Sequence, residues 1–140
     1  MLTPEVRAAI DEIGACFPKS PPAAAPDGQG GAFVVMEGLE LGPPYAQTDT
    51  WIGFHITQAC PYADVYPHFV RGDLTRADGA DFCVALQRGP VFPPPGAPVG
   101  TAMPARPAIQ VSRRSNRRDA SGLETPLLKL LKVLQWLRSR

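Results

Sequence analysis

Prolines and glycines set the strongest limit on what this chain can fold into. The 140 residues include 17 prolines and 13 glycines, and both residue types interrupt helices and strands. Most of them lie before residue 32, around residues 42–44 and 61–67, and between residues 89 and 107. The uninterrupted segments are short, so the sequence predicts a few helices and strands joined by long connections.

The composition is nevertheless that of a chain with a buried core. Hydrophobic residues make up 44% of the sequence and charged residues 19%, whereas disordered chains combine low hydrophobicity with high net charge. The length predicts one domain spanning residues 1–140. The net charge of +1 disfavours nucleic acid as a partner, because nucleic-acid binding relies on a large positive field.

The N-terminus, the apolar runs and the cysteines indicate where the protein is located and whether its cysteines form disulfides. No apolar run reaches the roughly 18–20 residues that span a bilayer, and the N-terminus lacks the pattern of a signal peptide. The three cysteines, Cys16, Cys60 and Cys83, are odd in number and lack metal-ligand spacing. We therefore expect a cytoplasmic protein with no membrane contact, no disulfide framework and no zinc site.

Two segments at opposite ends of the chain have helical apolar spacing, residues 3–17 and 124–137. Each opens with a Thr-Pro pair, Thr3-Pro4 and Thr125-Pro126, which supplies an N-cap and a proline suited to the first helical turn. The apolar positions are Val6, Ala9, Ile10, Ile13 and Phe17 in the first segment, and Leu127, Leu128, Leu130, Leu131, Val133, Leu134 and Leu137 in the second.

Between the helices the sequence predicts an antiparallel strand meander. Strands are expected at residues 32–41, 50–57 and 68–70, with Ile52, Phe54 and Ile56 on the buried face of the second. Residues 82–86 fit a further strand or a single helical turn. Residues 18–31 are expected to form a flexible linker and residues 89–107 a proline-rich crossing. The fold class is α+β, with helices packed on one face of the sheet.

Three passages of the chain carry a family pattern. They are Leu39-Glu40-Leu41-Gly42-Pro43-Pro44-Tyr45 followed by Trp51-Ile52-Gly53-Phe54-His55-Ile56; Pro61-Tyr62-Ala63-Asp64-Val65-Tyr66-Pro67; and Ser112-Arg113-Arg114 followed by Leu123-Glu124-Thr125-Pro126-Leu127-Leu128. In patches over roughly residues 32–137, they resemble the prokaryotic family E branch of the ubiquitin-conjugating-enzyme (UBC-like) superfamily. The resemblance implies a UBC-like fold in which a long, irregular active-site segment precedes the C-terminal helix.

The resemblance also implies an active site. Eukaryotic members carry His-Pro-Asn and then a catalytic cysteine, but this chain has no His-Pro-Asn and no cysteine after Cys83. The superfamily's usual distance from the final helix falls on or close to Ser112. On this resemblance Ser112 accepts a modifier as an oxyester, Arg113 and Arg114 stabilise the developing oxyanion, and Asn116 orients a carbonyl. The aromatic residue that usually follows the Ser-Arg pair is replaced around residues 116–118.

The alternatives to a catalytic Ser112 stay open. Ser112 could be a loop serine in a scaffold that has lost conjugating chemistry and binds the activating enzyme or the modifier. Cys83 is the rival nucleophile, although its apolar neighbours favour a buried position. Cys60, next to Pro61, could be exposed, and Cys16 is expected in the helix core.

The remaining polar candidates have structural or surface interpretations. His55 and His68 are too few for a metal site and are expected to be structural, with a general-base role for His68 as a second hypothesis. The arginine cluster fits either a solvated loop or a docking surface for an acidic partner or the modifier. Its members are Arg113, Arg114, Arg117 and Arg118.

The function implied by the resemblance is that of a conjugating transferase in a bacterial ubiquitin-like modification pathway. Its expected partners are an adenylating activating enzyme, which consumes the ATP, and a ubiquitin-like modifier, with contacts at residues 3–17 and 61–67. The resemblance implies no metal or organic cofactor. The oligomeric state is open. An accidental likeness on an unrelated α+β domain would be exposed by a fold without the meander between the helices.

Overall fold

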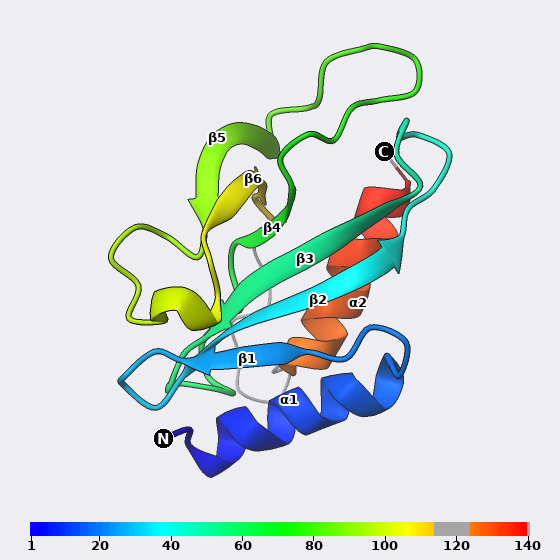
Figure 1. The fold of residues 1–140 in the computed structure, drawn as a ribbon. Helices are drawn as coiled ribbons and strands as arrows, with labels where there is room; N and C mark the ends of the chain where they lie inside the picture. The colour runs from blue at the N-terminus through cyan, green and yellow to red at the C-terminus, as the bar shows by residue number, and fades with distance from the viewer. Residues whose placement is uncertain (114–123, 140) are drawn as a thin grey trace.

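The computed structural model describes residues 1–113 and 124–139 (Figure 1). Both predicted helices are confirmed, as α1 (Pro4–Cys16) and α2 (Pro126–Arg138). Their threonine caps are in place: the Thr3 hydroxyl accepts a hydrogen bond from the Val6 amide at 3.1 Å, and the Thr125 hydroxyl accepts one from the Leu128 amide at 3.1 Å. The local Thr-Pro signal therefore fixes where each helix begins.

The α+β class is confirmed, with a six-stranded antiparallel sheet between the two helices in the sequence. The strands are β1 (Ala23–Pro26), β2 (Ala32–Glu40), β3 (Asp49–Ile56), β4 (His68–Arg71), β5 (Leu86–Phe92) and β6 (Arg106–Val111). Their order across the sheet is β1-β2-β3-β4-β6-β5. Strands β2, β3 and β4 match the three predicted strands, so the meander is present.

The main core lies between the sheet and the two helices. Ile52, Phe54 and Ile56 of β3 are fully buried there, as the alternation in the sequence predicts. They pack in one cluster with Ile13 of α1 and Leu134 of α2. Both helices thus cover the same face of the sheet. In Figure 1, α2 lies behind the sheet.

The expected flexible linker at residues 18–31 is wrong in part, because it contains strand β1. Ala23, Ala24 and Ala25 pair with β2 in register, Ala24 opposite Val34. The turn between these strands is held by Asp27, whose Oδ1 accepts hydrogen bonds from the amides of Gln29 and Gly31 at 2.7 and 3.0 Å. These contacts come from residues that show no apolar periodicity, so the pattern gave no sign of a strand.

The expected proline-rich crossing at residues 89–107 is also too long. Strand β5 runs to Phe92 and β6 begins at Arg106, which leaves residues 93–105, with a 3-10 turn at Gly100–Ala102, as the connection. Pro90 is tolerated because β5 is an edge strand and its register with β6 shifts between Arg88 and Val91. Of residues 82–86, only Leu86 belongs to a strand.

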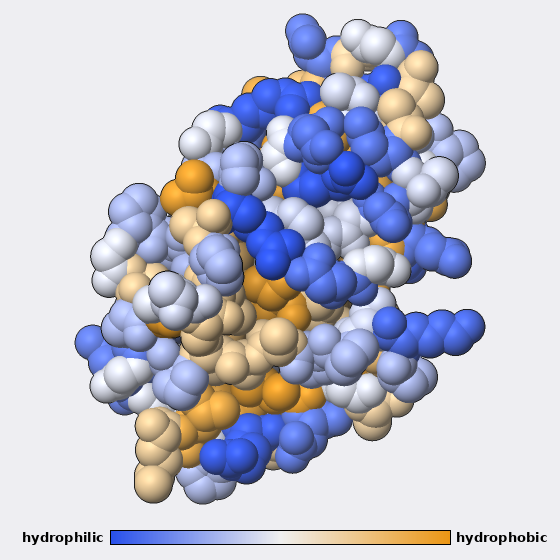
Figure 2. Space-filling view, in the orientation of Figure 1, coloured by the Kyte–Doolittle hydropathy of each residue, from blue (hydrophilic) through white to orange (hydrophobic). Residues whose placement is uncertain are grey.

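The second face of the sheet carries its own apolar cluster. Phe92 is 1% exposed and packs with Phe33 and Val35 of β2 and with Met103 from the 93–105 connection. Figure 2, drawn from this side, shows a patch of apolar residues in the lower half with hydrophilic residues around it. Among the described residues, no helix has both the length and the apolar character needed to cross a membrane.

Candidate functional site

Ser112 lies where the chain leaves the sheet at the end of β6. Its amide donates to the carbonyl oxygen of Ala85 at 2.8 Å, which extends the pairing of β5 with β6 by one step. Its hydroxyl accepts a hydrogen bond from Nε2 of Gln110 at 3.3 Å, and its side chain is half-buried. The backbone of Ser112 is therefore held in place at the end of the paired region of β5 and β6.

Arg113 is exposed beside Ser112 and turns toward α2. Its guanidinium carbon lies 5.1 Å from the ring centroid of Trp136, a distance at which a cation is attracted by the aromatic face. Within residues 1–113 and 124–139, no hydrogen bond joins Arg113 to Ser112. Arg114, Asn116, Arg117 and Arg118 lie outside the described residues.

All three cysteines have the opposite exposure from that expected. Cys16 and Cys83 are exposed, and Cys60 is 8% exposed, so burial raises the pKa of the Cys60 thiol. Cys16 is the last residue of α1. In the turn that precedes β5, Phe82 packs against the core, whereas Cys83 faces solvent.

The two rival nucleophiles lie near the same end of the sheet. The Leu86 amide donates to the Cys83 carbonyl at 3.0 Å, which closes the turn, and Ala85 in that turn pairs with Ser112. Leu86 is opposite Val111 in the ladder of β5 and β6. Ser112 and Cys83 are 29 positions apart in the sequence. The pairing of β5 with β6 brings them to the same end of the sheet.

His68 lies on the helix-facing side of the sheet, inside the core. It is 1% exposed, its ring centroid is 5.3 Å from that of Phe54, and neither ring nitrogen has a hydrogen-bond partner among the described residues. Burial, together with the nearby charge of Lys129, lowers the pKa of His68 to about 3. The enclosed ring is inaccessible to a reacting group, which argues against the general-base hypothesis.

His55 lies on the other face of the sheet and has structural partners. Its Nε2 is 2.7 Å from Oδ2 of Asp27, and its ring stacks on Phe33 with the centroids 4.2 Å apart. Although burial opposes it, the pKa of Asp27 is lowered, because the carboxylate accepts hydrogen bonds from His55 and from backbone amides. The pair ties β3 to the turn between β1 and β2.

An ion pair fastens the proline-marked loop to α2. Nζ of Lys129 lies 2.6 Å from Oδ1 of Asp64, and the Lys129 side chain is 4% exposed whereas that of Asp64 is 28% exposed. At the other end of the helix, the Tyr45 hydroxyl donates to the Leu137 carbonyl at 2.8 Å. Asp64 and Tyr45, both within the passages that carry the family resemblance, thus position α2.

Replacing Asp64 by asparagine is expected to lower the free energy of unfolding by about 2–3 kcal/mol, because it leaves the Lys129 ammonium buried without its counter-charge. Replacing Lys129 by methionine removes the buried charge itself and is expected to stay within about 1 kcal/mol of the parent protein. Urea unfolding of the two variants measures both values. Asp49→Asn, at an aspartate whose side chain is 58% exposed and whose partner Arg71 keeps its pair with Asp73, is the matched control, and an equal loss in D64N and D49N would contradict the prediction.

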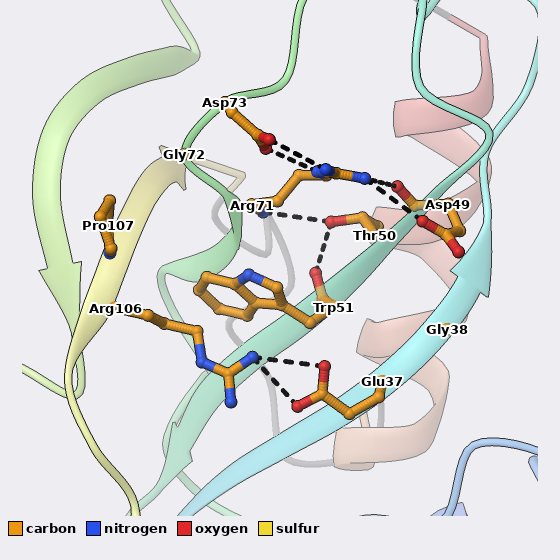
Figure 3. A pocket seen from close by; sticks show the side chains of 10 residues that line it. All are labelled: Glu37, Gly38, Asp49, Thr50, Trp51, Arg71, Gly72, Asp73, Arg106 and Pro107. Atoms are coloured by element: carbon orange, nitrogen blue, oxygen red, sulfur yellow. Dashed lines mark hydrogen bonds and ion pairs between the residues drawn. The ribbon is translucent and has the colours of Figure 1, made fainter.

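A pocket that the sequence reasoning missed lies on the sheet face opposite the helices. It has a volume of about 520 Å³ and is bordered by β2, β3, β4 and β6. Figure 3 shows Trp51 of β3 between two ion-paired arginines, Arg71 and Arg106. The signal in the sequence was Trp51 alternating with the buried aliphatic residues of its strand. Nothing in the sequence indicated that Arg71 and Arg106 would lie on either side of Trp51 in one pocket.

Within the part of the chain that the structure describes, no group of three or more histidine, cysteine, aspartate or glutamate side chains is placed to hold a metal ion. Comparisons with protein-family models, with curated proteins and with solved structures found no match to this chain.

Proposed function

We propose that the chain is a cytoplasmic UBC-like protein of a bacterial ubiquitin-like modification pathway and that Ser112 accepts the modifier. The observation that carries the proposal is the position of Ser112. It directly follows the last strand, is half-buried, and is followed by the exposed Arg113. An acceptor needs both a fixed backbone and an open approach, and Ser112 combines a paired amide with a strand end.

The reaction is an acyl transfer. Ser112 Oγ attacks the carbonyl carbon of the modifier's activated C-terminus, an oxygen–carbon bond forms, and the bond to the thiol or adenylate leaving group breaks. The hydroxyl proton passes to a base, which the activating enzyme or water supplies, and a guanidinium such as that of Arg113 favours the oxyanion. No organic cofactor takes part on this chain.

The second candidate is a non-catalytic scaffold of the same pathway that binds the activating enzyme or the modifier. One observation favours it: among the described residues the only side-chain hydrogen bond of the Ser112 hydroxyl is with Gln110, and no histidine or carboxylate contacts the hydroxyl. A serine without a base is a weak nucleophile.

The test uses the full chain, tagged and produced in its native host, then purified under denaturing conditions and weighed intact by mass spectrometry. The acceptor proposal expects a fraction with one modifier mass added, stable to reductant and released by hydroxylamine, as an oxyester is. Ser112→Ala should remove that fraction completely, whereas Cys83→Ala should retain it.

Ser112→Cys distinguishes the outcomes further. An acceptor position should convert the adduct to a thioester, which reductant releases. A reductant-sensitive adduct in the parent protein that disappears in C83A would transfer the role to Cys83. The absence of any adduct in all variants would leave the scaffold function as the conclusion, provided that the activating enzyme or modifier co-purifies under native conditions.

A further inference from the structure

The pocket around Trp51 has an ordered arrangement of charge. Arg71 is fully engaged: its Nε and Nη2 donate to Asp73 at 2.6 and 2.9 Å, and its Nη1 donates to the carbonyl and side chain of Asp49 at 3.1 and 3.3 Å. Arg71 thus borders the pocket with its guanidinium held in place, and Asp49 and Asp73 neutralise its charge (Figure 3).

Arg106 is only partly engaged. Its Nη1 lies 3.0 Å from Oε2 of Glu37, and its guanidinium carbon is 4.9 Å from the Trp51 ring centroid. Its Nε and Nη2, and the indole N–H of Trp51, make no hydrogen bond to any described residue. Because the indole face holds the guanidinium in place, Nε and Nη2 of Arg106 can bind a planar carboxylate in the two-pronged geometry that arginine favours. The indole nitrogen lies on the ring edge toward Arg71 (Figure 3).

The carboxylates of the pocket lie farther out than the arginines. The side chains of Glu37, Asp49 and Asp73 are 65%, 58% and 69% exposed, against 28% for Arg71 and 32% for Arg106. An anionic ligand would be repelled by the three outer carboxylates before it reached Arg106. A cationic ligand would be repelled by the arginine at the bottom of the pocket. A ligand with both charges satisfies both layers.

We propose that this pocket binds an amino-acid-like zwitterion with an aromatic side chain, either a free amino acid or a dipeptide. Its carboxylate binds Nε and Nη2 of Arg106, its ammonium lies at the rim between Glu37 and Asp49, and its ring packs beside Trp51. The volume suits a ligand of this size. This binding is independent of the acceptor role of Ser112, which lies beyond the opposite end of β6 from Arg106.

The test follows the two indole N–H signals of the full chain by NMR, with Trp136→Phe to identify the signal of Trp51. Titration with L-phenylalanine should shift the Trp51 signal to saturation with a Kd in the millimolar range or tighter, and should leave the Trp136 signal unmoved. Arg106→Gln should weaken binding at least tenfold. Arg7→Gln, on the surface of α1, should bind as the parent protein does.

Two analogues separate the zwitterion from simpler ligands. L-phenylalaninamide lacks the carboxylate and N-acetyl-L-phenylalanine lacks the ammonium, and each should bind at least tenfold more weakly than L-phenylalanine. Equal binding of either analogue, or no saturable shift with L-phenylalanine and with glycyl-L-phenylalanine, would overturn the proposal. If Arg106→Gln fails to fold, Arg106→Lys keeps the charge without the fork and should still lose most of the affinity.

Discussion

Replacing Phe92 by alanine is expected to lower the free energy of unfolding by about 3–5 kcal/mol, as for other fully buried phenylalanines. The Phe92 ring is the centre of the second core cluster: its centroid lies 5.0 Å from that of Phe69, 6.2 Å from that of Phe33 and 6.3 Å from that of Trp51. The 93–105 connection covers one side of this cluster and cannot collapse into the space without losing its own contacts. Urea unfolding at constant pH measures the loss.

Gly53 lies against the Phe92 ring and allows a second test of this packing. A Cβ placed on Gly53 would lie 2.5 Å from Cδ2 of Phe92, so Gly53→Ala alone should also destabilise the fold through overpacking. In the Phe92→Ala background the added methyl group enters vacated space, and its cost should largely disappear, which a double-mutant cycle detects. Val84→Ala, at a side chain that faces solvent, is the control. Additive effects of G53A and F92A would contradict the packing argument.

Lowering the pH from 6.5 to 4.5 is expected to cost the protein about 2 kcal/mol of stability through His68 alone, since each pH unit well between the folded and unfolded pKa costs about 1.4 kcal/mol and the unfolded histidine is already half protonated at pH 6.5. In the unfolded chain His68 takes up a proton near pH 6.5, whereas in the folded chain its pKa is about 3. Stability from this group is therefore complete above pH 6.5 and falls as the pH drops toward 3.

His68→Leu provides the comparison. It removes the two ring nitrogens that lack partners among the described residues, so it should be at least as stable as the parent protein at pH 7. Between pH 6.5 and 4.5 its free energy of unfolding should fall less steeply than that of the parent protein. The two slopes should differ by the uptake of about one proton, about 1.4 kcal/mol per pH unit. His55 and the carboxylates are present in both proteins and cancel in the difference. Equal slopes in the two proteins would contradict the burial of a neutral His68.

The helices and the central strands were predictable because their signals are local. Thr3-Pro4 and Thr125-Pro126 act within one helical turn, and the alternation of Ile52, Phe54 and Ile56 reflects only the two-residue repeat of a strand. Strand β1 was not predictable, since its alanines have no apolar pattern and pair only because β2 offers an edge. Strands β5 and β6 were hidden by their prolines. Pro90 is tolerated because β5 is an edge strand with a register shift there, and Pro107 of β6 lies just outside the residues that pair with β4.

The candidate sites were predictable to different degrees. Ser112 was reached through a family resemblance, and the structure places it directly after β6; its role as an acceptor stays a prediction. The pocket around Trp51 joins Glu37, Arg71 and Arg106, which lie up to 69 positions apart in the sequence. No spacing rule links such residues, because the contact depends on strand order.

The prolines and glycines, with the two Thr-Pro caps and the strand alternation, determined the sequence of elements: helix, meander, irregular connection, helix. Tertiary structure decided which side chains meet. It exposed Cys83 and buried Cys60, turned His68 into the core, and set Arg106 over Trp51. Backbone preferences act between neighbours in the chain, whereas exposure and electrostatics depend on the packing of segments that are distant in the sequence.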